Sequence, residues 1–123
     1  MSKQLVPFVI AVLGLIAAAV TVEAHALLVR AEPRVGSKVN KSPKEVRVSF
    51  SEAVRAGAST IKIFDATGKQ VDKKDTHSDP ANRNVLCVSL IPALPIGSYK
   101  VVWRVTSMDT HVTDGNFHFQ IAP

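Results

Sequence analysis

Short runs in which every second residue is apolar constrain the fold of this chain more than any other feature. Clear examples are Val46–Phe50, Tyr99–Val105 and Asn116–Ile121. Successive side chains of a β-strand point to opposite faces of its sheet, so this alternation predicts strands with one buried face. Proline, glycine, asparagine and aspartate separate the runs, which is typical of antiparallel strands joined by turns. No helix is expected, and the sequence therefore predicts an all-β domain.

The alternation also gives approximate strand bounds. We expect a short strand near Lys69–Val71 and main strands near Ala26–Ala31, Val46–Phe50, Thr60–Phe64, Val85–Leu90, Tyr99–Val105 and Asn116–Ile121. Their apolar rows, which include Trp103, would face one another across the core of an immunoglobulin-like sandwich of about seven strands. Asp65–Gly68 is predicted to be a hairpin turn, because glycine accepts the positive φ that a tight turn requires. The polar stretch Asp72–Asn84 is expected to be the longest loop.

The N-terminal segment has the features of a secretory signal peptide. Lys3 precedes an apolar run, Leu5–Val20, and small residues stand before an expected cleavage site after Ala24. We therefore assign residues 1–24 to a signal peptide and residues 25–123 to one domain, which is long enough for a single β-sandwich core.

Three alternatives to this processing stay open. Residues 17–19 and residues 24–26 also satisfy the small-x-small rule for cleavage, and the second of these cuts would remove His25. The third alternative is an uncleaved membrane anchor, because the apolar run is near the lower length limit for a bilayer span.

Charge and cysteine content exclude two classes of protein. The formal net charge is +5, but the cations are scattered and interleaved with acids. A nucleic-acid surface would need a clustered basic stripe with stacking aromatics, so no nucleic-acid partner is expected. The chain has one cysteine, Cys87, so no disulfide can form within it. Cys87 lies in an apolar run without a histidine close in sequence, which favours a buried thiol over a blue-copper ligand.

His25 would become the first residue after cleavage behind Ala24, and a free N-terminal histidine is a chelator. Its α-amine and its imidazole can bind one metal ion through two nitrogens once the amine has lost its proton. Asp109 and His111 supply a carboxylate and an imidazole two residues apart. If that segment is extended, both side chains point the same way.

The chain resembles the CopC family of periplasmic copper-binding proteins. Four segments carry the resemblance: His25, Glu32-Pro33 with Gly36-Ser37, Phe50-Ser51-Glu52, and Gly97–Arg104 with Ser107–His111. The resemblance implies a small Greek-key β-barrel or sandwich that binds Cu(II) through His25, Asp109 and His111. It also implies copper delivery in the periplasm, with a membrane copper transporter of the CopD type as a partner.

The donor set favours one Cu(II) ion per mature chain. Three nitrogens and a carboxylate oxygen suit tetragonal Cu(II), and divalent copper binds such sites more strongly than zinc, its natural competitor. Some members of the family also have a methionine-rich Cu(I) site. Met108 is the single methionine after the leader, and thioether sulfur is the ligand that selects Cu(I), so a second site is not expected.

Other candidate ligands are weaker. Glu52 would lie at a strand end near the copper, as a group that orients the ligands or as a weak ligand. An ordinary surface carboxylate is the alternative. His77 lies in the long polar loop, and His118 alternates with core-facing phenylalanines, so both are expected to face solvent.

The sequence thus favours a periplasmic Cu(II)-binding protein for copper homeostasis or resistance, and not an enzyme. A histidine-brace oxidative enzyme is the first alternative, since such enzymes also hold copper with an N-terminal histidine. A domain this small offers little substrate-binding surface for one. A structural β-sandwich module with an incidental metal site is the second alternative.

Overall fold

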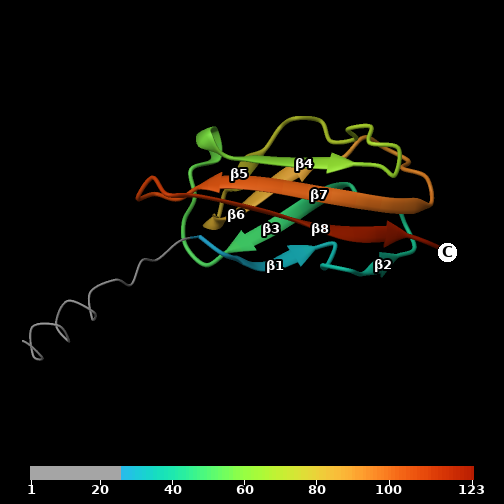
Figure 1. Cartoon of the computed structure of the whole chain (residues 1–123), viewed down its shortest axis with the longest axis horizontal. Helices are drawn as coiled ribbons and strands as arrows, with labels where there is room; N and C mark the ends of the chain where they lie inside the picture. The colour runs from blue at the N-terminus through green and yellow to red at the C-terminus, as the bar shows by residue number, and fades with distance from the viewer. Residues whose placement is uncertain (1–25) are drawn as a thin grey trace, which may run out of the picture.

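Two four-stranded β-sheets pack face to face in the computed structural model, which describes residues 26–123 (Figure 1). The signal peptide assigned to residues 1–24 and the predicted ligand His25 lie outside the described residues. The strands are β1 (Leu28–Glu32), β2 (Lys38–Val39), β3 (Glu45–Phe50), β4 (Thr60–Phe64), β5 (His77–Asp79), β6 (Asn82–Ser89), β7 (Gly97–Thr106) and β8 (Val112–Ile121). Among residues 26–123 no helix is long and apolar enough to cross a membrane.

The strand order is β1-β3-β6-β5 in the first sheet and β2-β8-β7-β4 in the second. Strands that follow each other in sequence, such as β3 and β4, lie in different sheets, while β3 pairs with β6 and β4 with β7. These crossings between sheets are those of a Greek-key sandwich. The predicted all-β sandwich is therefore confirmed. Its eight strands form two open sheets and not a closed barrel.

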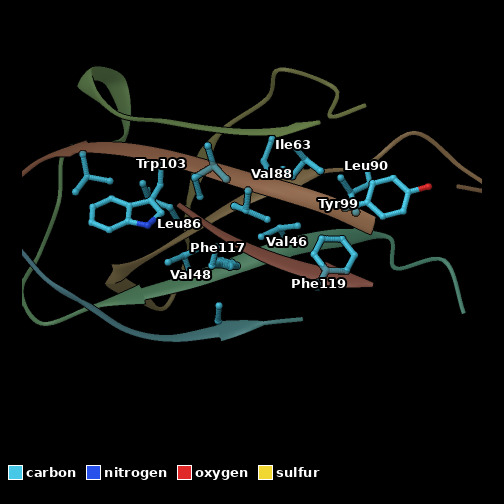
Figure 2. Close-up of a cluster of buried hydrophobic side chains, with 14 of the residues drawn as sticks. Val46, Val48, Ile63, Leu86, Val88, Leu90, Tyr99, Trp103, Phe117 and Phe119 are labelled. Atoms are coloured by element: carbon cyan, nitrogen blue, oxygen red, sulfur yellow. The ribbon is translucent and has the colours of Figure 1, made fainter. Parts of the chain in front are cut away.

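The predicted apolar rows meet in one core (Figure 2). Tyr99 stacks on Phe119 with ring centroids 5.5 Å apart, and Phe50 meets Trp103 edge to face at 5.3 Å. Figure 2 shows Trp103 at one end of this cluster and Tyr99 at the other. The Tyr99 hydroxyl donates a hydrogen bond to the Pro95 carbonyl at 2.6 Å, which satisfies its polar group at the edge of the core.

Three local predictions need correction. The stretch expected as the long loop Asp72–Asn84 contains β5 and the start of β6, because the polar residues of β5 pair along the edge of β6 and need no buried face. Near Lys69–Val71 the structure has an isolated bridge from Phe64 to Gln70 instead of a strand. One short 3-10 helix, η2 (Ala56–Ala58), precedes β4.

Side chains close the outer edge of β4 where the predicted strand is missing. Asp72 is buried, and its Oδ1 accepts a hydrogen bond from the Ile63 N–H at 2.9 Å. Thr76 accepts another from the Ile61 N–H at 3.3 Å. Two apolar strand residues thus satisfy their backbone donors without a neighbouring strand. The predicted hairpin turn is confirmed, since Gly68 has φ +89° and donates to the Asp65 carbonyl at 3.0 Å.

Gly115 gives a test of the core. It lies opposite Trp103 in the β7–β8 ladder, and a Cβ added at Gly115 would come within 2.6 Å of the Trp103 ring. Gly115→Ala should therefore cost about 1 to 3 kcal/mol of unfolding free energy through overpacking. Denaturant unfolding followed by circular dichroism measures the change.

Gly57→Ala is the matched control. A Cβ at Gly57 meets no atom within 4 Å, so this variant should stay within about 0.5 kcal/mol of the parent protein. Equal stability of the two variants would contradict the packing of Trp103 against Gly115.

Candidate metal centre

Three segments far apart in sequence meet at one end of the sandwich (Figure 1). They are the residues leading into β1, the segment after β3, and the turn between β7 and β8. Leu27 and Ser51 exchange hydrogen bonds, from the Leu27 N–H to Ser51 Oγ at 2.9 Å and from the Ser51 N–H to the Leu27 carbonyl at 2.8 Å. The Thr113 hydroxyl donates to the Ala26 carbonyl at 2.7 Å. The start of the described chain is thereby fastened to the beginning of β8.

The segment carrying Asp109 and His111 is a turn, so the condition that it be extended is not met. The Thr110 N–H donates to the Ser107 carbonyl at 2.9 Å, and the Ser107 N–H donates to the His111 carbonyl at 2.9 Å. Thr110 has φ +71°, in the left-handed region. Because β7 and β8 pair as far as Thr106 and Val112, the chain must reverse direction within a few residues. A turn meets this requirement and an extended strand cannot.

The turn nevertheless brings the two predicted ligands together. His111 Nδ1 lies 3.3 Å from Asp109 Oδ2, and the two side chains are 46% and 52% exposed. The carboxylate and the imidazole thus meet at a surface that an ion can reach from solvent. Their proximity comes from the reversal of the chain and not from the period of a strand.

Ser107 is a buried polar residue that sequence reasoning missed. Its hydroxyl donates to Asp109 Oδ1 and also reaches the His111 carbonyl at 3.3 Å. The hydrogen bond from Ser107 is the main cause that lowers the pKa of Asp109 below its ordinary value, and the nearby His111 lowers it further. Asp109 is therefore held as a carboxylate, the form that binds a cation. Apart from the nearness of Ser107 to Asp109, no sequence pattern indicates this role.

The segment after β3 supports the same turn from the other sheet. Ala53 accepts a hydrogen bond from the Met108 N–H at 3.3 Å, and Arg55 Nη2 donates to the Met108 carbonyl at 3.1 Å. Val54 forms a bridge with Ser107. Glu52 precedes Ala53 and is partly buried at this end of the sandwich. The structure thus places Glu52 in the same region as the predicted ligands.

The residues described supply two of the three predicted ligands. Within residues 26–123 no group of three His, Cys, Asp or Glu side chains could hold a metal ion. Ala26 is 1% exposed and fixed to Thr113, which is two residues beyond His111.

Two further histidines lie on the outer faces of the sheets. His118 is exposed and pairs with Lys100 across β7 and β8. His77 pairs with Cys87 across β5 and β6, a proximity that sequence spacing did not reveal. Both histidines are exposed, as expected. Within residues 26–123, His77 and Cys87 do not belong to any group of three side chains that could hold a metal ion.

Cys87 is the buried free thiol that the sequence predicts. It is 2% exposed, and burial raises its pKa, which disfavours the thiolate that binds metal. Arg47 Nη1 lies 3.3 Å from the sulfur, and the positive charge of this guanidinium would repel a metal cation.

The match to a known family agrees with this geometry. Residues 28–122 match the model of the CopC domain. The chain belongs to the CopC family. The predicted family and the predicted sandwich are thus both confirmed, and membership supports a copper resistance protein and not an enzyme.

Several similar proteins have names that refer to copper. The copper transport protein CutJ of Bacillus subtilis is 32% identical over 98 residues, which cover 80% of this chain but 18% of CutJ. The crystal structure of CopC from Methylosinus trichosporium OB3b matches with a TM-score of 0.75 and 35% identity, covering 80% of this chain and 95% of that one. PcoC, a methionine-rich copper resistance protein from Escherichia coli, matches with a TM-score of 0.71 and 28% identity, covering 80% and 100% of the two chains.

The Ser107 hydroxyl gives a pH test of the turn. In Ser107→Ala the pKa of Asp109 should rise toward its ordinary value, because the main cause of its lowering is removed. A carboxyl whose pKa is lowered by folding stabilises the fold above its unfolded pKa, near 3.9, and loses this contribution as the pH falls through the folded value. The stability difference between the two proteins should therefore be largest above about pH 5 and narrow toward about pH 2.

Carboxyl-carbon NMR titration measures the pKa, and denaturant unfolding across this pH range measures the stability. Ser98→Ala, near the opposite end of β7, is the control and should leave the pKa of Asp109 unchanged. An unchanged Asp109 pKa in Ser107→Ala would mean that this hydroxyl does not act on the carboxylate.

Proposed function

We propose that this CopC-family protein binds one Cu(II) ion at the β7–β8 end of the sandwich and delivers it in the periplasm. The ligands are the α-amine and imidazole of His25, the imidazole of His111, and the carboxylate of Asp109. The observation that carries the proposal is the hydrogen bond from Thr113 to Ala26 at 2.7 Å, beside the Asp109–His111 pair. This bond ties the residue next to His25 to the strand that begins after His111.

The chemistry of the donors supports divalent copper as the cargo. Nitrogen donors with a carboxylate oxygen suit Cu(II), which binds such sets more strongly than zinc does. The residues described contain one methionine, Met108, so a methionine-rich Cu(I) site has no counterpart among them. One Cu(II) site per chain is therefore the stoichiometry we propose.

The exposure of the site supports a carrier role. The Asp109 and His111 side chains are about half exposed, so a recipient can approach a bound ion without unfolding the domain. Three apolar side chains next in sequence to the proposed ligands or to Ala26 are also exposed. Their exposed fractions are 61% for Leu27, 38% for Met108 and 47% for Val112. Exposed apolar side chains beside a polar centre can contribute to a contact with a recipient protein.

A membrane copper transporter of the CopD type is the recipient that we propose. CutJ is named a copper transport protein, and this chain corresponds to a small part of its length. A CopC-like segment inside a longer transport protein supports a partnership between a copper-binding domain of this family and a copper transporter. Glu52 lies near the ligand end, and we propose that it orients a ligand through a hydrogen bond.

Processing is the first requirement of this function. The exported protein should begin at His25, because small residues precede that position and the chelating amine exists only after cleavage. Mass spectrometry of the protein recovered from the periplasm gives its first residue. A chain that begins at residue 20 or 27, or that retains the leader, would remove the basis of the N-terminal chelate.

Ligand substitution tests the copper site. His111→Ala, or one residue added before His25, should weaken Cu(II) binding far more than Asp109→Asn, because each removes nitrogen ligands. Binding should also weaken below about pH 7, where imidazole and α-amino groups gain protons. Competition with a Cu(II) chelator gives the affinity, and electron paramagnetic resonance reports the nitrogen ligands.

His77→Ala and His118→Ala are the matched controls, since both imidazoles are exposed on the outer faces of the sheets. They should leave the affinity and the spectrum unchanged. Full Cu(II) affinity after the N-terminus is blocked would show that the metal binds elsewhere, and a second tight Cu(I) site would contradict the proposed stoichiometry.

A further inference from the structure

The outer face of the β2-β8-β7-β4 sheet is basic. On these strands the side chains directed away from the core include Lys38, Lys62, Lys100 and Arg104, all exposed. Asp114 is the single carboxylate carried by the four strands. The net positive charge of the protein is therefore concentrated on one sheet, although the cations are scattered in the sequence.

The other sheet has a balanced outer face, so the asymmetry is not a property of the whole surface. Its strands carry three arginines and three carboxylates. Arg47 lies 3.8 Å from Glu45 and 3.5 Å from Asp79, which neutralises the centre of that sheet. The basic face thus has no equivalent on the opposite side of the sandwich.

The cations of the basic face lie close together. Lys62 pairs with Val102 across β4 and β7, and Lys100 and Arg104 flank Val102 on the same side of β7. Diagonal neighbours across antiparallel strands are about 7 to 8 Å apart. Arg104 has an ion pair with Asp114 at 3.6 Å, whereas Lys62 and Lys100 form no ion pair within residues 26–123. An anionic partner would relieve the repulsion among these three cations.

The shape of this face selects the partner. The backbone N–H and C=O groups of a sheet lie in the plane of the sheet, so the outer face presents side chains and no backbone donors to an added peptide strand. The aromatic residues Tyr99 and Trp103 point into the core and cannot stack on nucleic-acid bases. What remains is a face with clustered positive charge, which has a hollow beside Lys100 and His118. A phospholipid surface presents its phosphates in a plane and can meet several of these cations at once.

We propose that the outer face of the β2-β8-β7-β4 sheet docks on an anionic phospholipid membrane. The strands then lie along the bilayer, and the β7–β8 turn lies at the edge of the contact. This inference rests on the charges of the sheet and does not require that the turn bind copper.

Vesicle binding tests the proposal with the protein as secreted, its first residue verified by mass spectrometry. The probes are vesicles of phosphatidylcholine with phosphatidylglycerol and vesicles of phosphatidylcholine alone. The protein should bind the anionic vesicles, release them at high salt, and bind the neutral vesicles far more weakly. The triple substitution Lys62→Gln, Lys100→Gln and Arg104→Gln should lower the partition coefficient on the order of 100-fold, since each cation near an anionic surface contributes about fivefold.

The matched control removes the same charge from exposed lysines outside the basic strands, by Lys41→Gln, Lys44→Gln and Lys73→Gln. This control should change binding less than about threefold. An equal loss of vesicle binding in both triple variants would show that binding depends on net charge alone, which would overturn the proposal. Tighter binding to polyglutamate or to a single-stranded oligonucleotide than to the anionic vesicles would also overturn it.

Circular dichroism verifies that each variant is folded. If the triple variant does not fold, the single substitutions Lys62→Gln and Lys100→Gln decide the question. Each should lower vesicle binding by about fivefold. Unchanged binding in both single variants would refute the assignment of this face.

Discussion

The pairing of β7 with β8 is the constraint on which the rest of this structure depends. The two strands are in register along all of β7, from Gly97 with Ile121 to Thr106 with Val112. The inward side of this ladder supplies every aromatic residue of the core except Phe50. Its outward side carries Lys100 and Arg104, and its connecting turn carries Asp109 and His111. A shift of one residue would exchange these two sides, so core packing and surface charge are specified by the same register.

Much of this arrangement could be predicted because alternation has a direct physical meaning. The rows around Trp103 and Phe119 are apolar at every second position, and a pleated strand converts that period into one buried face. The main strands and the hairpin turn at Gly68 followed from local pattern. β5 did not, because it is short and polar and pairs at the edge of a sheet. Such a strand is stabilised by its neighbour and not by a buried face, and its own sequence carries no signal.

The residues of the candidate site can be proposed from the sequence, but their geometry cannot. The types of Asp109 and His111 and their resemblance to a family motif identified them. Their contact depends on a left-handed Thr110 and on a buried Ser107, and both follow from closing a long hairpin. The convergence of Arg55 and Thr113 on this end depends on contacts between distant segments. No local period encodes such contacts, so sequence reasoning could name the donors without assembling them.

The burial of Ala26 has a consequence for the order of events during export. Its side chain is in the core and its carbonyl is held by Thr113, while the adjacent Leu27 is held by Ser51. A peptidase needs an extended, accessible backbone on both sides of the bond that it cuts. If the leader is removed before His25, folding of the domain withdraws the residues after the bond from that enzyme. On that condition, cleavage has to come before the sandwich closes, while the backbone of Ala26 and Leu27 is still accessible.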